Sequence, residues 1–280
     1  MSTPPKETYD FKSHFDKNAA LYEKLTGGST RRIAEACIQL LPPLSSTLRI
    51  LDSACGPGIV TKLILDWANE HGVVPPPHIT AIDFAPGMIS QLETHKSMLE
   101  WNTVDARVLD AQCLEGIVDE NFDAIVMNFG IFTLPDAELG AREMLRVLKS
   151  GGTAIVTTWK SSGPIDLLER VVRAIRPEDV NRVYPVSKDW FTVEKVKNTM
   201  ISGGFKEAKL HLHVVRTMWQ NSSLEELVDA MSGPFWQRIW DGWTEEEKGR
   251  WRGEVKKQMT EKEWSKCGLD MAAWVCVAVK

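Results

Sequence analysis

A loop of small residues after an apolar segment is the first feature of this chain that could do chemistry. Residues 48–51 (LRIL) run into residues 52–58 (DSACGPG), and a helical pattern follows at once. Because Gly56 and Gly58 have no side chain, a ligand could lie against main-chain N–H groups, which would face its carboxylate. The acid Asp52 suits a cationic group on the same ligand. A tight turn that only packs a strand against a helix is the alternative.

Two more acids follow the next two apolar segments. Asp83 comes directly after residues 78–82, and Asp110 comes directly after residues 106–109. A carboxylate after the second strand can accept hydrogen bonds from both hydroxyls of a ribose, although Asp83 would equally serve as a helix N-cap. Asp110 can accept from the amino group of an adenine while the N–H of Ala111 donates to a ring nitrogen.

Apolar side chains beside these acids could form the walls of an adenine site. Phe84, Met88 and Cys113 are the candidates, and ordinary core filling is the alternative for each of them. The order along the chain favours the binding site. Open α/β folds bind ligands at the carboxyl ends of their strands, and the loop and both acids follow successive strands.

The elements that must position these residues alternate between short apolar runs and helical patterns. Uninterrupted apolar runs of this kind are typical of a parallel sheet that is covered on both faces. The expected strands are residues 48–51, 78–82, 106–109, 124–127, 153–157, 206–215 and 271–279. The expected helices are two runs within 11–41, broken at 26–29, and then 59–71, 86–92, 136–148, 164–175 and 192–202. This order predicts an α/β fold with a Rossmann-like, doubly wound sheet.

Composition excludes several other classes of protein. The chain has 280 residues, 43% of them hydrophobic, which is enough for one α/β domain with covering elements. A net charge of -5 argues against nucleic acid and anionic membranes as partners. Five scattered cysteines without a CxxC pair indicate no metal site and a reducing, cytoplasmic location. Residues 1–20 lack the apolar core of a signal peptide, and no stretch is apolar enough to span a membrane.

With these residues in place, the chain resembles the class I S-adenosylmethionine-dependent methyltransferases, most clearly over about residues 48–160. The acidic and cysteine-containing glycine loop of that family corresponds to residues 52–58, with Asp52, Ala54, Cys55, Gly56 and Gly58. Its Asp-x-Ser-x-x-Met segment corresponds to residues 83–88 (DFAPGM), where alanine replaces serine. Its helix ending in "RVLKPGG" corresponds to residues 145–152 (LRVLKSGG).

The resemblance implies S-adenosylmethionine as the cofactor and a seven-stranded sheet whose last strand inserts antiparallel. It also implies that Asn128 and Phe129 face the methionine end of that cofactor. Tyr22, with the residues at 26–27 and a run beginning at Trp243, looks like fungal natural-product methyltransferases, including those that methylate gliotoxin-type thiols. We therefore expect a helical lid at 1–45, a cofactor-binding core at 46–160, and further strands with substrate-cap insertions at 161–280, within one overall domain.

The expected acceptor is a small molecule with a thiol or a hydroxyl. Methyl transfer from a sulfonium is an in-line displacement, so alignment of the reactants and exclusion of water are its main requirements. A thiol needs little further help, whereas a hydroxyl would benefit from a general base, for which His14 is the candidate. His211 and His213 are interpreted as exposed edge-strand residues. Most of the eleven tryptophans lie beyond residue 150, where they are expected to form a cap core, with one or two lining the acceptor pocket. We expect a monomer or a weak homodimer.

Two other functions compete with this hypothesis. A nicotinamide-dependent oxidoreductase would use a similar loop, but its fingerprint places a third glycine or alanine where this chain has Thr61, and Asp52 is unusual in it. The third hypothesis is a protein that keeps the cofactor-binding fold without methylating anything.

A calorimetric titration separates the first two hypotheses. We expect S-adenosylhomocysteine to bind and NAD not to bind, because the acids at 52, 83 and 110 match the cationic, ribose and adenine groups of the first ligand. Binding of NAD with no binding of S-adenosylhomocysteine would contradict the methyltransferase interpretation.

Overall fold

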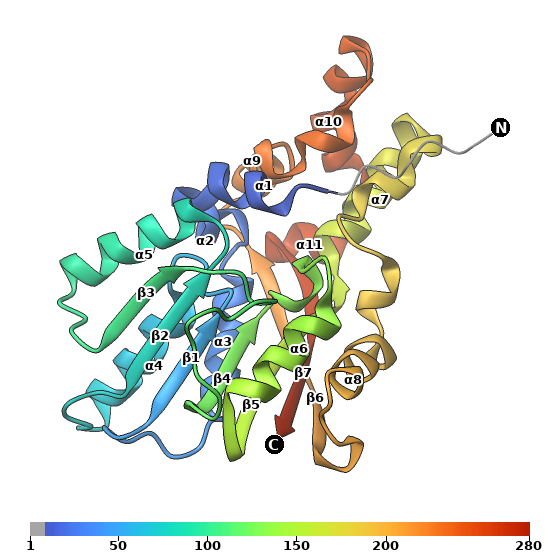
Figure 1. Cartoon of the computed structure of the whole chain (residues 1–280). Helices are drawn as coiled ribbons and strands as arrows, with labels where there is room; N and C mark the ends of the chain where they lie inside the picture. The colour runs from blue at the N-terminus through green and yellow to red at the C-terminus, as the bar shows by residue number, and fades with distance from the viewer. Residues whose placement is uncertain (1–8) are drawn as a thin grey trace.

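A seven-stranded sheet forms the centre of the computed structural model, which describes residues 9–280 (Figure 1). The strand order is β3-β2-β1-β4-β5-β7-β6. The strands are β1 Arg49–Ser53, β2 His78–Asp83, β3 Val104–Val108, β4 Phe122–Asn128, β5 Leu148–Ser162, β6 Leu210–Gln220 and β7 Gly268–Val279. Neighbouring strands from β1 to β5 pair in parallel, and β7 inserts antiparallel between β5 and β6. The predicted sheet, including its antiparallel last strand, is confirmed.

Helices cover both faces of this sheet, which explains the continuous apolar runs of its central strands. On one face lie α3 (Ser29–Ile38), α4 (Ile59–Glu70) and α5 (Pro86–Met98), and their apolar sides pack on β1, β2 and β4. On the other face, α6 (Ala137–Val147) and α8 (Val193–Ser202) pack on β4, β5 and β7. Each large aliphatic side chain buried in these two layers contributes roughly 1.5–3 kcal/mol to folding.

The end of the sheet formed by β6 differs from the prediction. The expected strand at 206–215 begins and ends later, because a short 3-10 turn occupies Glu207–Lys209 and pairing with β7 continues as far as Gln220. Trp219 therefore belongs to β6, and the Trp-rich insertion begins after it rather than at it. His211 and His213 are exposed on this edge strand, as interpreted from the sequence.

The N-terminal helices are shorter and more broken than the sequence pattern suggested. They comprise α1 (Phe11–Asn18), a 3-10 turn, α2 (Tyr22–Leu25) and α3. The predicted break is confirmed, since Gly27 and Gly28 have positive φ angles of 54° and 65°. A side chain at Gly27 would collide with the indole of Trp219, so this turn also packs directly against β6.

A helical cap covers the carboxyl end of the parallel strands. It consists of α7 (Gly163–Ile175), α9 (Leu224–Met231), α10 (Glu245–Gln258) and α11 (Glu261–Lys266), together with 3-10 segments at Pro177–Val183, Lys188–Phe191 and Pro234–Trp240. The cap lies beside α1 at the top of the molecule (Figure 1).

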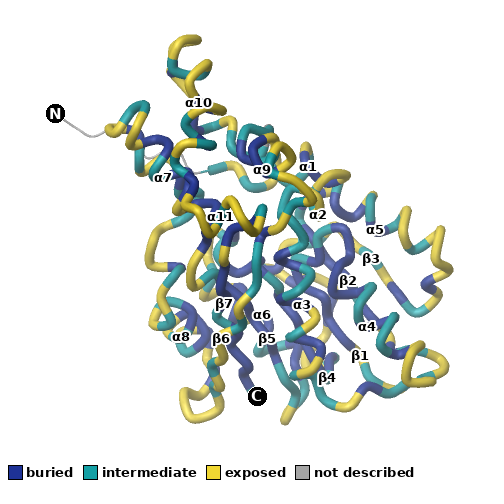
Figure 2. The backbone as a smooth tube through the Cα atoms, turned by 180° about the vertical axis from the view of Figure 1, so that it is seen from behind, coloured by how far each residue is buried: buried dark blue, intermediate teal, exposed yellow. Residues whose placement is uncertain are grey.

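The cap has its own apolar core, made of aliphatic side chains and several tryptophans. Trp219, Trp243 and Trp251 are buried together, and the Trp251 indole donates to the Met231 carbonyl at 3.1 Å. The expectation that most late tryptophans form a cap core is confirmed. The charged run in α10 forms an exposed helical face around the buried Trp251 and Val255, as predicted (Figure 2).

Across residues 9–280, no helix is long and apolar enough to cross a membrane.

Candidate functional site

The loop between β1 and α4 has a backbone that only small residues tolerate. Ala54, Gly56 and Gly58 all have positive φ angles, of 53°, 54° and 92°. A Cβ at Gly58 would lie 3.1 Å from Leu92 of α5, whereas a Cβ at Gly56 would meet only the sulfur of Met88, at 4.0 Å. Gly58 therefore has to be small because Leu92 packs against it, whereas Gly56 leaves the loop backbone accessible.

The N–H groups of this loop do not fit the expected role. Cys55 donates to the Ile82 carbonyl at 2.8 Å, Gly56 to the Asp83 carboxylate at 2.9 Å and Gly58 to the Cys55 carbonyl at 3.1 Å. These donors are already engaged within the protein, so the expectation that they face a ligand carboxylate is wrong for all three. What the loop offers a ligand is close approach to its backbone.

Asp52 is buried at the end of β1 with one carboxylate oxygen in use. Its Oδ2 accepts from the backbone N–H and the hydroxyl of Thr61, at 3.0 and 2.7 Å. Its Oδ1 is also buried and has no partner among the described residues. Burial raises the pKa of this carboxyl to about 7, against the lowering effect of the Thr61 hydrogen bonds. Asp52 thus orients the start of α4 and keeps one oxygen for a cationic or donor group.

Asp83 joins the end of β2 to the loop. Its Oδ2 accepts from Gly56, and its Oδ1 accepts from the N–H of Ala85 at 2.9 Å. The N-cap position of α5 is held by Ala85, so the alternative role of Asp83 as that helix's N-cap is wrong. Burial raises the pKa of Asp83 to about 6. Each carboxylate oxygen retains a lone pair for a further donor, such as a ribose hydroxyl.

Asp110 lies two residues beyond β3, beside the end of β2. The neighbouring Leu109 donates to the Asp83 carbonyl at 3.0 Å, which holds the two strand ends together. Asp110 is exposed, and its Oδ1 accepts from the backbone N–H of Gln112 at 2.8 Å. Ala111 is buried next to it. Cys113 is exposed and does not form an inner wall.

The side chains predicted as adenine walls lie under the N-terminal helices. Met88 is buried in a small cluster with Ala19 and Ala85, and Phe15 packs against this cluster. Phe84 is half-buried and meets the ring of Phe15 edge to face, with centroids 6.5 Å apart. The sequence analysis missed the contact that fastens this lid: Asp16 accepts from the N–H of Gly87 at 2.8 Å.

Asn128 and Phe129 follow β4 and are tied to both neighbouring elements. The Asn128 amide donates to the Thr30 carbonyl at 3.2 Å and accepts from the Thr157 hydroxyl at 2.9 Å. Phe129 has a positive φ of 60°, and its ring stacks on Trp159 with centroids 3.8 Å apart. This strained turn places the Phe129 ring toward the cap.

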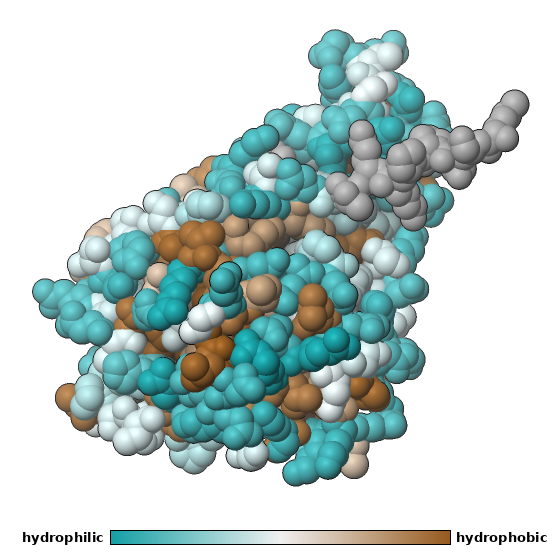
Figure 3. Space-filling model, viewed as in Figure 1, coloured by the Kyte–Doolittle hydropathy of each residue, from teal (hydrophilic) through white to brown (hydrophobic). Residues whose placement is uncertain are grey.

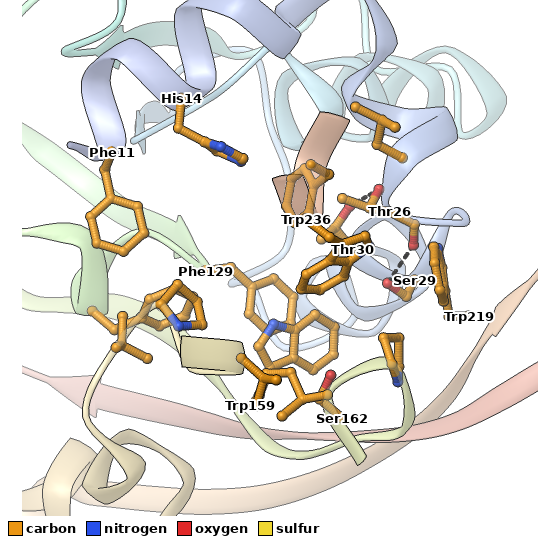
Figure 4. Close-up of a pocket in the computed structure, with 18 of the residues that line it drawn as sticks. Phe11, His14, Thr26, Ser29, Thr30, Phe129, Trp159, Ser162, Trp219 and Trp236 are labelled. Carbon is orange, nitrogen blue, oxygen red and sulfur yellow. Dashed lines mark hydrogen bonds between the residues drawn. The ribbon is translucent and has the colours of Figure 1, made fainter. Parts of the chain in front are cut away.

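A cavity of about 1030 Å³, its open mouth included, lies between the N-terminal helices and the cap (Figure 4). Tyr22, Thr30 and Phe129 line it, so it adjoins the edge where the loop and the acids meet. Apolar side chains gather where the cap meets the sheet edge (Figure 3). The remaining aromatic walls are Tyr9, Phe11, Phe15, Phe132, Trp159, Trp190, Phe191, Trp219, Phe235 and Trp236.

His14 projects into this cavity from α1 (Figure 4). Burial and the nearby Arg238 lower the pKa of its imidazole to about 4. The ring packs edge to face on Phe235, with centroids 4.5 Å apart. The imidazole is therefore neutral at pH 7 but a weak base.

The sequence analysis overlooked Arg238 in the same wall. The signal was present as a single cation within the aromatic run 234–240 (PFWQRIW). A cation among so many apolar residues is informative, because buried charges normally have partners.

Comparisons with known proteins bear on this geometry. A family model described as a methyltransferase domain matches residues 51–156. Methyltransferase ucsB of Acremonium sp is 30% identical over 210 residues, covering 71% of this chain and 69% of that protein. Methyltransferase tpcH of Aspergillus fumigatus is 24% identical, covering 79% of this chain and 80% of that protein. The structure of Haemonchus contortus phosphoethanolamine N-methyltransferase 2 with S-adenosyl-L-methionine shares the fold, with a TM-score of 0.58 at 16% identity, covering 100% of this chain and 60% of that one.

The raised pKa values of Asp52 and Asp83 predict a stability that depends on pH. The folded state holds protons that the unfolded carboxyls, with pKa values near 4, have released, so the free energy of unfolding should fall as pH rises from about 4 to about 7. Urea unfolding of the wild type and of Asp52→Asn, measured across that range, checks this expectation. The variant should lose part of the slope, at about 1.4 kcal/mol for each unit of pKa difference removed.

Comparing the variant with the wild type controls for His14. The lowered pKa of His14 makes the free energy of unfolding rise with pH, and this contribution is the same in both proteins. Parallel pH profiles for the two proteins would contradict the titration of Asp52 in this window.

Proposed function

The chain belongs to the S-adenosylmethionine-dependent methyltransferases, and we propose that it methylates a thiol or a hydroxyl of an aromatic small molecule bound between α1 and the cap. The observation that supports this acceptor class is the cavity itself, which is apolar, aromatic and next to the loop and acids at the sheet edge. We also propose a role in fungal secondary metabolism; the relatives from Acremonium and Aspergillus support the fungal part of this proposal, since they are methyltransferases of fungi.

The residues at the sheet edge fit the cofactor. When bound, S-adenosylmethionine supplies a methyl group on a sulfonium. We propose that Asp83 accepts from the ribose hydroxyls and that Asp110 with Ala111 recognises the adenine between Phe84 and Met88. The unpartnered Asp52 Oδ1 is the observation that supports a cationic group nearby, since a buried carboxylate oxygen without a donor is costly.

The other proposed cofactor contacts are with the loop after β1 and with the residues expected at the methionine end of the cofactor. Ala54, Cys55, Gly56 and Gly58 allow close approach of the ligand to the backbone. Tyr22, Asn128 and Phe129 lie where this region meets the cavity, and Asn128 is held by Thr30 and Thr157.

The reaction depends more on alignment of the reactants than on a catalytic group. The bond between the acceptor atom and the methyl carbon forms as the carbon–sulfur bond breaks, leaving S-adenosylhomocysteine and a proton released from the acceptor. Alignment can contribute up to about 7–11 kcal/mol to lowering such a barrier. The lid fastened by Asp16 and the aromatic walls would exclude water from the reacting atoms.

We further propose that the protein works in the cytoplasm as a monomer or a weak homodimer. The five cysteines are all unpaired, which suits a reducing compartment.

Incubation with labelled S-adenosylmethionine tests the proposed reaction. We expect label in aromatic thiols or phenols from a panel that also contains amines and aliphatic carboxylic acids. Asp83→Ala should abolish cofactor binding and transfer together, because the ribose contact and the loop anchor are both lost. Label only in amines, or in nothing while the cofactor binds, would contradict this function.

His14→Ala tests whether a general base is needed. A base with a pKa near 4 takes up a proton poorly at pH 7, so turnover of an aromatic thiol should stay within a few-fold of the wild type. His211→Ala, on the exposed edge strand, is the matched control. A fall of several orders of magnitude in kcat, with cofactor affinity unchanged, would instead identify His14 as the base.

A further inference from the structure

Arg238 brings a charge into the wall of the acceptor cavity, and no acidic side chain among residues 9–280 forms an ion pair with it. It lies in the 3-10 segment Pro234–Trp240 of the cap, and its guanidinium sits over the ring of Tyr9, 4.5 Å from the centroid. Its Nη2 atom is buried and has no hydrogen-bond partner among residues 9–280. Burial lowers the pKa of Arg238 below its usual range, and the protein therefore holds this charge at a cost.

The two neighbouring arginines each form an ion pair, which Arg238 does not do with any acidic residue among residues 9–280. Arg176 and Arg182 both pair with the carboxylate of Asp179, at 3.2 and 3.3 Å. Arg182 also donates to the Asp241 carbonyl. Asp241 acts on Arg238 only at longer range, and Arg182 adds positive charge from the same side. Arg238 differs from both neighbours because its guanidinium lines the cavity instead of forming an ion pair.

Two other unpartnered groups in the cavity wall are also hydrogen-bond donors. The indole Nε1 atoms of Trp219 and Trp236 are buried and lack acceptors among the described residues. Figure 4 shows both tryptophans in the wall of the cavity. With Arg238 Nη2, the buried unpaired polar atoms of this wall are hydrogen-bond donors in each case. Because the Trp219 indole edge that carries Nε1 packs against Gly27, the donors that an occupant with acceptor oxygens would satisfy are those of Arg238 and Trp236.

We propose that the acceptor is an aromatic acid whose carboxylate binds Arg238 while a separate thiol or hydroxyl is methylated. This inference rests on the proposed function and narrows its substrate class. Carboxylate fits better than a neutral carbonyl, because a planar guanidinium binds it through two parallel hydrogen bonds. Asp241 and Arg182 act on Arg238 with charges of opposite sign. The titratable side chains that line the cavity beside Arg238, Tyr9 and His14, are neutral at pH 7, since burial raises the pKa of Tyr9 to about 12 and lowers that of His14 to about 4. Neither would repel or neutralise the anion.

Calorimetry with a matched pair of ligands tests the proposal. A hydroxynaphthoic acid and the corresponding hydroxynaphthamide differ only in the charge of the anchoring group, and both are titrated into the full chain saturated with S-adenosylhomocysteine. We expect the acid to bind at least about tenfold more tightly, as a charged hydrogen-bonded contact requires. Arg238→Met should reduce this preference to about twofold or less.

Three further variants keep the result interpretable. Arg216→Met makes the same change on the exposed part of β6 and should leave the preference intact. Arg238→Lys keeps the charge and should retain part of the preference, whereas Arg238→Gln should lose it, so a folding defect of the methionine variant does not decide the outcome. Equal binding of the two ligands, binding of neither, or a preference that survives Arg238→Gln would overturn the proposal.

Transfer assays separate this inference from the function on which it rests. A carboxylate preference without transfer to any acceptor would contradict the methylation of this class of molecule and leave the anion site in place. Efficient transfer to neutral phenols or thiols, with the acid and the amide bound equally, would overturn the anion site and leave the methyltransferase function in place.

Discussion

The hydrogen bond from the Gly56 N–H to the Asp83 carboxylate is the contact on which the rest of the site depends. It joins the end of β2 to the loop after β1, and the loop backbone can adopt this shape only because small residues occupy its positive-φ positions. The same carboxylate holds Ala85, from which α5 begins. Because the N–H of Gly87 in α5 donates to Asp16 of α1, this pairing also sets where the N-terminal helices contact α5.

Asp52 and Asp83 are buried at this edge with little to neutralise them, a pattern that is common at ligand sites. Asp52 and Asp83 both have raised pKa values whose main cause is burial, and the nearby Asp83 carboxylate raises the pKa of Asp52 further. A cationic, hydroxyl-rich ligand would relieve that cost. The cavity beyond Phe129 has the opposite character, since its walls are aromatic and its unpaired polar atoms are donors. The two halves of the site therefore differ in the polar groups that they offer to a ligand.

Much of the cofactor half could be predicted because its signals are local. Each acid follows a continuous apolar run, and the alternation of strand and helix requires the carboxyl ends of β1, β2 and β3 to meet at one edge. Hydrogen bonding within the loop could not be predicted, since the donors of Cys55, Gly56 and Gly58 are taken by residues brought in from β2 or by the turn itself. The role of Asp83 likewise depended on which N–H groups reached it in space.

The acceptor half was decided by tertiary structure. Sequence alone determined that a doubly wound sheet would present acids at one edge and that the late tryptophans would cover it, because hydrophobic period and strand order need no long-range detail. It could not assign Trp219 to β6, since that depended on how far β7 extends the pairing. The sequence shows Arg238 as a single cation among aromatic residues, but it did not show that Arg238, unlike Arg176 and Arg182, would line a cavity. Asp179 pairs with Arg176 and Arg182 at three-residue spacings within the cap, and the packing of the cap against α1 leaves Arg238 facing the cavity.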